Sequence, residues 1–450
     1  MKRLFLFLQI VIVALTTSAG GLMTNTNYHI AFDRMMARGA TSDIDAIYSN
    51  PAGIAWTHEG FQLSFNWQYP RQDRDITATF PLFPDENHTH KFHGDATAPF
   101  VPGLFASYRK GDWSLSAMIG IVGSGGYVKY DEGIPMFSAP VMAMLYSVNN
   151  TLTPTTYDLK SQMKGKQYIF GGQLNFAYRF NEHLSAAIGG RLSYYSGYYR
   201  GGVNVTLKQP QVELLSMALD TDQKGWGFAP LLGLNYRVGG LTLAAKYEFR
   251  TKLNIPNDTK TLTATVLNPT TMQPMPAATV MALVGDKLAP YQDGVKTRYD
   301  MPALLSVAAG YEFIPDKLRA TVEYHFFDDK NAHMSGDREK ALKRGTHEVL
   351  AGIEWDINKR FTVSAGGQRT DYGLSDEYQA NTSFACDSYS VGLGGAVNIT
   401  GHLRLNLGYF WTMYSDYTKH VDDYYGTKLA GTEVMHRTNR VLGIGVDYKF

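Results

Sequence analysis

The stretch KQYIFGGQLNFAYRF, residues 166–180, alternates between apolar and polar side chains. One face carries Tyr168, Phe170, Leu174, Phe176, Tyr178 and Phe180, and the other carries Gln167, Gln173, Asn175 and Arg179. A hydrophobic period of two residues predicts a β-strand with chemically different faces. The stretches KLRATVEYHF (317–326) and HLRLNLGYFWTM (402–413) alternate in the same way, so the pattern is not confined to one region.

The alternating pattern recurs in fourteen segments, most of them 10 to 16 residues long. They begin near Phe61, Pro99, Asp112, Lys166, His183, Lys224, Gly240, Arg298, Asp316, Arg344, Lys359, Ala385, His402 and Arg437. A tilted strand needs about 9–11 residues to cross the apolar layer of a membrane. Strands of soluble proteins are typically only about 5–6 residues long. The segment length therefore favours membrane-spanning strands.

The connections between these segments alternate between short and long. Short turns are predicted at 109–112, 181–182, 238–240, 314–316, 357–359 and 400–401. Long polar loops are predicted at roughly 70–98, 124–165, 200–223, 254–297, 328–343, 371–384 and 415–435. This alternation is typical of outer-membrane barrels. We predict an all-β fold, a 14-stranded antiparallel transmembrane β-barrel over residues 61–450, in the outer membrane of a Gram-negative cell.

Aromatic side chains near the short turns share the phase of the apolar face. They are Tyr108, Trp113, Phe180, Tyr236, Phe249, Phe313, Trp355, Phe361 and Tyr448. Amphipathic rings favour the interface between lipid and water, so a girdle is expected at this end of the barrel. The last strand ends on Phe450, which resembles the terminal signal that barrel-assembly machinery recognises. Outer-membrane lipids and that machinery are the predicted macromolecular partners.

The N-terminus has the composition of an export signal. Lys2 and Arg3 precede the apolar run LFLFLQIVIVAL (4–15), and small residues up to Ala19 follow. A basic start, a short apolar core and a small-residue site predict a secretory signal peptide, here residues 1–19. The alternative is a buried N-terminal helix.

Composition excludes several functions. The net charge of +1 and the lack of long basic runs argue against a nucleic-acid partner. Cys386 is the only cysteine, so neither an internal disulfide nor a cysteine metal cluster can form. We predict no cofactor and no resident metal.

The residues between the signal and the first strand, 20–60, read as short helices rather than strands. SDID (42–45) resembles a capping box, and Asn50-Pro51 can end one helix and start the next, because proline suits the first helical position. Their apolar side chains need burial. We predict that residues 20–60 form a small helical hatch that plugs the barrel lumen; a periplasmic tail is the alternative.

The stretch ARGATSDIDAIYSNPAGIAW, residues 37–56, resembles the hatch of the FadL-type outer-membrane transporters for long-chain fatty acids and other hydrophobic compounds. The match centres on the hatch motif Asn50, Pro51, Ala52 and Gly53. The resemblance implies a passive transporter whose partner is a hydrophobic ligand, a fatty acid or an aromatic compound. It further implies capture by apolar external loops and lateral release through a kink in the third strand.

Two groups of residues are candidates for these steps. Glycines that would permit a kink crowd the outer end of the third strand at Gly120, Gly123, Gly125 and Gly126; alternatively they only begin the next loop. The stretch 134–148 predicts an amphipathic helix whose candidate capture residues are Met136, Phe137, Val141, Met142, Leu145 and Tyr146. Alternatively, these apolar patches pack on one another.

Cations in the lumen phase could recognise a carboxylate or pair with acids to hold the hatch. The cations are Arg179, Arg191, Arg237, Lys246 and Arg250, and the acids are Glu248, Glu323, Glu348, Glu354 and Asp356. Pairing is the favoured interpretation.

Other functions are less well supported. An enzyme is not predicted, because no histidine comes with a recognisable nucleophile motif. His88, His90 and His93 share one predicted loop and would permit weak metal binding, which leaves a haem or other ligand receptor as the alternative. An adhesin-like or general porin is the remaining alternative, disfavoured by the plug and the apolar loops.

Overall fold

The computed structural model describes residue 22 and residues 28–268, 271–280 and 289–450. The predicted signal peptide, residues 1–19, lies outside the described residues. No helix in the described part of the chain is long and apolar enough to span a membrane.

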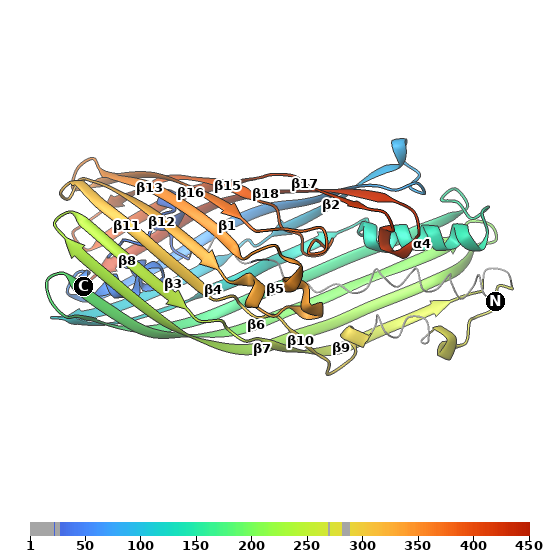
Figure 1. The fold of residues 1–450 in the computed structure, drawn as a ribbon, viewed down its shortest axis with the longest axis horizontal. Coiled ribbons are helices and arrows are strands. Elements are labelled where there is room, and N and C mark those ends of the chain that lie inside the picture. Colours follow the sequence, from blue (N-terminus) through green and yellow to red (C-terminus); the bar gives the residue numbers. More distant parts are fainter. Residues whose placement is uncertain (1–21, 23–27, 269–270, 281–288) are drawn as a thin grey trace.

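The described strands form one antiparallel sheet that closes on itself (Figure 1). The strands are β1 (Gly60–Thr79), β2 (Thr89–Thr97), β3 (Val101–Lys110), β4 (Trp113–Tyr130), β5 (Tyr157–Arg179), β6 (Leu184–Leu207), β7 (Val212–Val238), β8 (Leu241–Glu248), β9 (Asn254–Val266), β10 (Lys296–Arg298), β11 (Leu304–Ile314), β12 (Leu318–Phe327), β13 (Thr346–Asp356), β14 (Phe361–Asp371), β15 (Ser388–Asn398), β16 (Leu403–Tyr414), β17 (Tyr417–Val421) and β18 (Gly431–Lys449). Closure comes from β1 pairing with β18 along its whole length.

At four positions around the barrel, two shorter strands together take the place of one long strand. The eighteen observed strands therefore correspond to the predicted fourteen. β2 and β3 both pair with β1, β8 and β9 both pair with β7, and β16 and β17 both pair with β18. β10 and β11 continue one another opposite β9 and β8. The fourteen-stranded antiparallel barrel is therefore confirmed.

The outer surface is apolar in the pattern that the alternation predicts. All nine aromatic residues of the predicted girdle are exposed, from Trp113 at 37% to Phe180 at 60%. The inward face of the same strands carries buried polar residues, such as Gln173 and Asn175 on β5. A closed barrel with lipid-compatible side chains outside and polar ones inside is the architecture of an outer-membrane protein.

Several of the predicted long loops are strand instead. β1 and β2 include 70–79 and 89–97, β5 begins at Tyr157, β6 runs to Leu207, and β7 begins at Val212. β9, β17 and the start of β18 likewise lie in predicted loops, so the loop prediction at 70–98, 124–165, 200–223, 254–297 and 415–435 is wrong for these parts. Beyond the membrane layer the ladder of backbone hydrogen bonds continues, while the outward face is free to carry polar residues, so the apolar alternation ends before the strand does.

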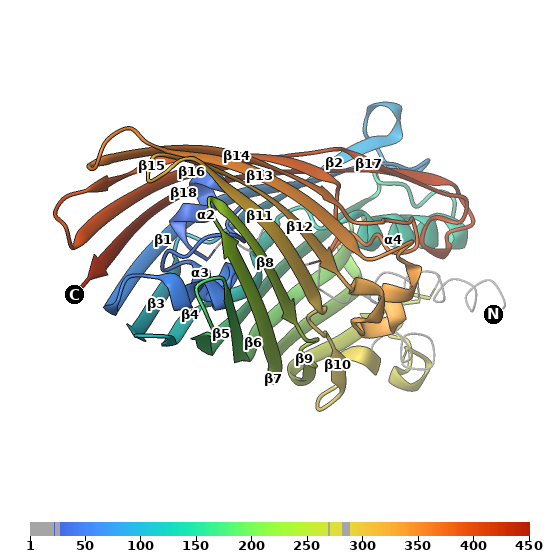
Figure 2. The same ribbon diagram turned by 60° about the vertical axis from the view of Figure 1, so that its left-hand side comes forward.

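The N-terminal segment, residues 28–59, contains α2 (Ile30–Met35), α3 (Ala46–Ser49) and the 3-10 helix η2 (Pro51–Trp56). α2 contacts β1, β13–β16 and β18, whereas η2 contacts β3–β8. Because these strands lie on opposite sides of the barrel, the segment lies in the lumen. Figure 2 shows α2 and α3 near the end of the barrel that holds the short turns and the C-terminus.

The opposite end of the barrel, with the long connections, carries α4 (Pro135–Val148) and the short 3-10 helices η3 (Glu86–His88), η4 (Ala289–Tyr291), η5 (Asp329–Asn331), η6 (Ser335–Ala341) and η7 (Tyr424–Gly426). α4 lies within a large apolar cluster that includes Phe80, Val205 and Tyr424. The molecule thus has one end filled by the N-terminal segment and another covered by loops and α4.

Candidate functional site

The wall of the barrel has a gap beside β4. β4 pairs with β3 up to Gly120, opposite Gly103, and pairs with β2 only from Tyr127, opposite Thr97. Residues 121–126 therefore have no strand partner on that side. The segment opposite them is the connection from β2 to β3. An interrupted ladder in a barrel wall is an opening in the hydrogen-bonded sheet.

Two irregularities on the other side of β4 accompany this gap. The register with β5 shifts between Ile121 and Gly123 and again between Ser124 and Gly126. Such bulges bend and twist a strand. Gly126 has a φ of +68°, a conformation that glycine adopts without the penalty that a Cβ brings. The predicted glycines Gly120, Gly123, Gly125 and Gly126 thus lie in or beside the irregular stretch, all within β4 rather than in a loop.

A hydrogen bond joins the first bulge of β4 to the N-terminal segment. The Tyr28 hydroxyl donates a 2.7 Å hydrogen bond to the carbonyl oxygen of Val122. Tyr28 also contacts Tyr48, with ring centroids 4.2 Å apart. Burial, the largest influence, raises the pKa of Tyr28 to about 12, so the phenol keeps its proton and remains a donor at neutral pH. One side chain of the segment therefore contacts the irregular part of the wall directly.

A cavity of about 220 Å³ adjoins this gap. Its lining comes from both edges of the gap and from strands across the barrel: Leu22, Tyr28, Gln68, Pro70, Gln72, Arg74, Ala96, Thr97, Ala98, Val101, Ile121, Val122, Gly123, Gly126, Val128, Tyr130, Met163, Gly165, Lys166, Gln167, Tyr199, Tyr299, Tyr372, Thr382, Ser383, Phe384, Ala385, Phe410, Tyr414, Arg437, Asn439 and Val441. Most of these side chains are apolar or aromatic, as in pockets for apolar ligands. The arrangement can hold a small hydrophobic molecule next to the opening.

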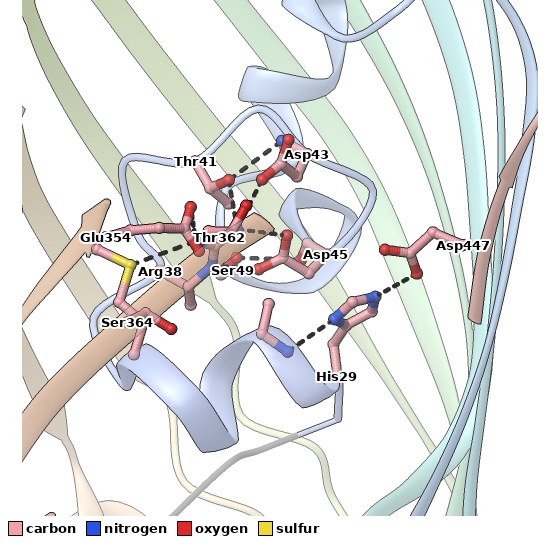
Figure 3. A network of polar contacts seen from close by, with 12 residues as sticks. His29, Arg38, Thr41, Asp43, Asp45, Ser49, Glu354, Thr362, Ser364 and Asp447 are labelled. Carbon is pink, nitrogen blue, oxygen red and sulfur yellow. Dashed lines mark hydrogen bonds and ion pairs between the residues drawn. The ribbon is translucent and has the colours of Figure 1, made fainter. Parts of the chain in front are cut away.

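Arg38 organises the polar core of the N-terminal segment (Figure 3). Its guanidinium donates to both carboxylate oxygens of Asp45, at 2.7 and 2.9 Å, and to Asp43 at 3.0 Å. Arg38 and Asp45 are both buried. Burial alone would lower the pKa of Arg38, but Asp45 and Asp43 raise it above its ordinary value. This bidentate pair fixes the loop that joins α2 to α3.

Further ion pairs fasten the segment to the wall. Arg34 pairs with Glu354 of β13, which also pairs with Arg319 of β12. The backbone N–H groups of Arg38 and Gly39 donate to Glu323 at 2.9 and 2.8 Å. These contacts join the segment to two neighbouring strands.

His29 and Asp447 form a second attachment. The His29 Nδ1 atom accepts from the backbone of Ala31, so Nε2 carries the proton and lies 3.2 Å from Asp447 of β18. Figure 3 shows this contact on the side of the segment opposite Glu354.

The predicted hatch motif forms the turn into η2. The Asn50 side chain accepts from the backbone of Gly53 and donates to the Thr41 carbonyl and to Asn235 of β7, at 3.2, 3.0 and 2.8 Å. Pro51 and Ala52 begin the helix and are buried. A Cβ at Gly53 would meet the Asn50 amide and the Thr41 carbonyl at 2.5 Å, so glycine is required there. The motif therefore both caps a helix and attaches the segment to the barrel.

The candidate capture residues lie on α4, so the predicted helix is confirmed. Met136, Phe137, Val141, Met142 and Leu145 are buried, and only Tyr146 among the six is exposed, at 45%. The predicted amphipathic pattern is wrong, because every residue of the helix from Pro135 to Leu145 is buried. They share one apolar cluster with Leu214, Leu215 and Val280, which matches the alternative that the apolar patches pack on one another, and ligand capture by these residues stays a prediction.

The predicted lumenal cations divide into three groups. Arg191 and Lys246 both pair with Glu248, each at 2.7 Å, and both lie over the Tyr48 ring. The pairing predicted for them is confirmed. Arg179 and Arg250 pair instead with Asp112 and Asp300, outside the predicted set of acids. Arg237 stacks over Trp56.

Sequence reasoning missed three residues of this site, Tyr28, Arg74 and Arg437. Arg74 lies in a stretch predicted to be a loop, and Arg437 lies at a predicted strand start. Neither side chain was therefore assigned to the inward face of a strand. If the alternation of β1 and β18 is extended toward the long-loop end of the barrel, both arginines fall on the face that points into the lumen.

No protein-family model matches this chain, and no curated protein matches its sequence. Solved structures match over nearly its whole length. A Pseudomonas aeruginosa FadL homologue has a TM-score of 0.68 at 12% identity, covering 96% of this chain and 100% of its own. The Pseudomonas putida toluene transporter TodX has a TM-score of 0.60 at 13% identity, with the same coverage. The Ralstonia pickettii toluene transporter TbuX has a TM-score of 0.55 at 14% identity, covering 94% and 99%.

These likenesses establish the fold. The protein is an outer-membrane β-barrel, and its fold is that of the FadL-type transporters, as the sequence resemblance implied.

Proposed function

We propose that the protein is a passive outer-membrane transporter for hydrophobic small molecules, such as long-chain fatty acids or aromatic hydrocarbons. Ligand enters through the apolar long-loop end, occupies the cavity, and leaves sideways through the gap beside β4 into the bilayer. In this proposal residues 1–19 are the export signal and residues 20–60 are the hatch that closes the lumen. Transport is downhill and is drawn onward by later consumption of the ligand.

The observation that carries this proposal is the position of the cavity. It is lined by Ala98 and Val101 from one edge of the gap and by Ile121, Val122 and Gly126 from the other. A hydrophobic molecule there can reach lipid without crossing the polar segment below it. The buried ion pairs of that segment support a lumen closed to hydrophilic solutes.

Uptake of labelled oleate tests this function. Cells that lack their own outer-membrane fatty-acid transporter would express the full chain or a variant lacking residues 28–57, with a small hydrophilic dye as control. We expect the full chain to admit oleate and exclude the dye, and the variant to admit the dye. Folded, surface-located protein that moves neither oleate nor toluene would contradict the proposal.

A further inference from the structure

Two carboxylates lie directly opposite each other on the outward face of the barrel, beyond its apolar belt. Asp73 of β1 pairs in register with Asp95 of β2. Asp73 has the same phase as the lipid-facing Phe65 but lies farther toward the long-loop end. Like charges opposed on neighbouring strands are destabilising. In the described part of the chain no lysine or arginine pairs with either carboxylate, and Lys129, opposite Asp95 on β4, pairs with Asp131 instead.

His93 of β2 completes this group. Its Nε2 atom lies 3.3 Å from Asp95 Oδ1, and one ligand atom of each of the three side chains lies within 4.8 Å of both others. An imidazole nitrogen with two carboxylate oxygens is a donor set that zinc and related first-row metals accept. Bonds of about 2.0–2.2 Å to one tetrahedral ion place its ligand atoms about 3.4 Å apart, so the His93–Asp95 spacing already fits and Asp73 needs to move by about 1.5 Å at most.

Two further residues hold these ligands in place. Asp75 lies opposite His93 in the strand register, and its Oδ1 atom is 2.5 Å from His93 Nδ1. This contact keeps a proton on Nδ1 and leaves Nε2 facing Asp95, the arrangement that metal-binding histidines almost always have. The Thr438 hydroxyl of β18 donates to Asp73 Oδ2 at 2.8 Å, so this carboxylate is held as well.

The other two histidines of this region do not take part. His90 and His93 are three residues apart on β2, so they point to opposite faces of the sheet. The two ring nitrogens of His90 face two different acids, Asp85 at 3.0 Å and Glu132 at 3.2 Å, so no single ion can bind one nitrogen and both acids. His88 Nδ1 contacts a backbone carbonyl. The three histidines that the sequence places together therefore do not converge on one site.

A second group of possible ligands, on the connection from β12 to β13, is less suited to a metal ion. It consists of His333, Asp337 and Glu339. Asp337 pairs with Lys340 at 2.6 Å, so one of its carboxylates is already neutralised. The group on β1 and β2 has no such competing cation on its two carboxylates.

We propose that Asp73, His93 and Asp95 bind a divalent transition-metal ion, such as Zn²⁺, on the external face of the barrel, with Asp75 as the positioning residue for His93. The ion offsets the repulsion between the opposed carboxylates and links β1 to β2. Ca²⁺ and Mg²⁺ prefer sites made of oxygen alone, so the imidazole favours a transition metal. No resident metal was predicted from the sequence, because strand register rather than spacing brings these ligands together. The site is independent of the proposed transport function.

Isothermal titration calorimetry with ZnCl₂ and with CaCl₂ tests this assignment. The full chain, without a polyhistidine tag, would be in nanodiscs, with empty nanodiscs as blanks. The test variants are His93→Gln and Asp95→Asn, whose side chains are 51% and 65% exposed, so neither change should disturb the barrel. The matched control is His90→Gln, which removes a histidine of the same strand that also contacts two acids.

We expect wild-type protein to bind one Zn²⁺ per chain, at least about tenfold more tightly than Ca²⁺. His93→Gln should weaken Zn²⁺ binding at least about tenfold and leave Ca²⁺ binding unchanged, whereas Asp95→Asn should weaken the binding of both ions. Asp75→Asn should weaken Zn²⁺ binding by about 10- to 100-fold without changing Ca²⁺ binding, because it acts only through the imidazole. The control should stay within about twofold of wild type.

Wild-type protein that binds no Zn²⁺, or that binds Zn²⁺ and Ca²⁺ equally, would overturn the proposal. Equal losses of Zn²⁺ affinity in His93→Gln and His90→Gln would overturn it too. Loss of Ca²⁺ binding in Asp75→Asn would overturn the positioning role of Asp75. None of these results would affect the transport proposal.

Discussion

Replacing Arg38 by methionine should loosen the N-terminal segment and make the barrel leak. The variant loses the hydrogen bonds to Asp45, Asp43 and Thr41 and leaves the buried Asp45 carboxylate without its bidentate partner. Removing one member of a buried ion pair costs about 3–5 kcal/mol. The population with a displaced segment should therefore rise about 100- to 5000-fold.

Conductance of single barrels in planar bilayers measures this population. Wild-type protein should stay closed to small ions, and Arg38→Met should show frequent openings. Arg440→Met is the matched control, because Arg440 is exposed and lies on the outward side of β18. Arg38→Met/Asp45→Asn should recover part of the closure, because the uncompensated charge is gone.

Unchanged conductance in a folded Arg38→Met protein would refute this reasoning, as would equal openings in Arg440→Met. A double variant that leaks more than the single one would show that Asp45 is not held through Arg38.

Three further predictions concern the wall and the outer loops. Tyr28→Phe leaves the Val122 carbonyl without its donor, a loss of about 1–3 kcal/mol; hydrogen exchange measured by mass spectrometry over residues 121–126 should accelerate, and unchanged protection would contradict the tie between segment and bulge. Gly126→Ala forces a Cβ into a φ of +68° and should cost about 1–2 kcal/mol in urea unfolding, whereas Gly172→Ala, whose added Cβ meets nothing within 4 Å, should cost less. Burial raises the pKa of Asp329 to about 7. Because the folded state holds this proton more tightly than the unfolded state, stability should fall as pH rises from about 4 to 7, by about 1.4 kcal/mol per pH unit at most. Thermal melting of Asp329→Asn should lack this slope, and parallel pH profiles for the variant and the wild type would contradict the assignment.

The alternation of side chains was sufficient to predict the barrel. In β5 the outward Phe170, Leu174 and Phe176 are exposed and the inward Gln173 and Asn175 are buried, as a period of two requires. The Asn50-Pro51 turn was equally readable, because both its cap and its proline act through local geometry. The extension of the strands beyond the membrane could not be predicted from the sequence, since polar and apolar residues do not alternate strictly there.

The candidate site depended on contacts between distant residues. Tyr28 bonds to a residue 94 positions away, and Arg34 pairs with Glu354, 320 positions away. The sequence contained the glycines of β4, but where its pairing with β3 ends and that with β2 begins depends on register. The sequence also contained Arg74 and Arg437, but their position opposite each other depends on closure of the barrel between its first and last strands.

By itself, the sequence determined the barrel, its strand number, its lipid-facing surface and the local form of the N-terminal turn. These properties follow from side-chain period and backbone chemistry within a few residues. Only the tertiary structure decided where the wall opens, what fills the lumen and which cations lack acid partners. Those features arise from the register between strands and from packing across the lumen, which bring together side chains that no short stretch contains.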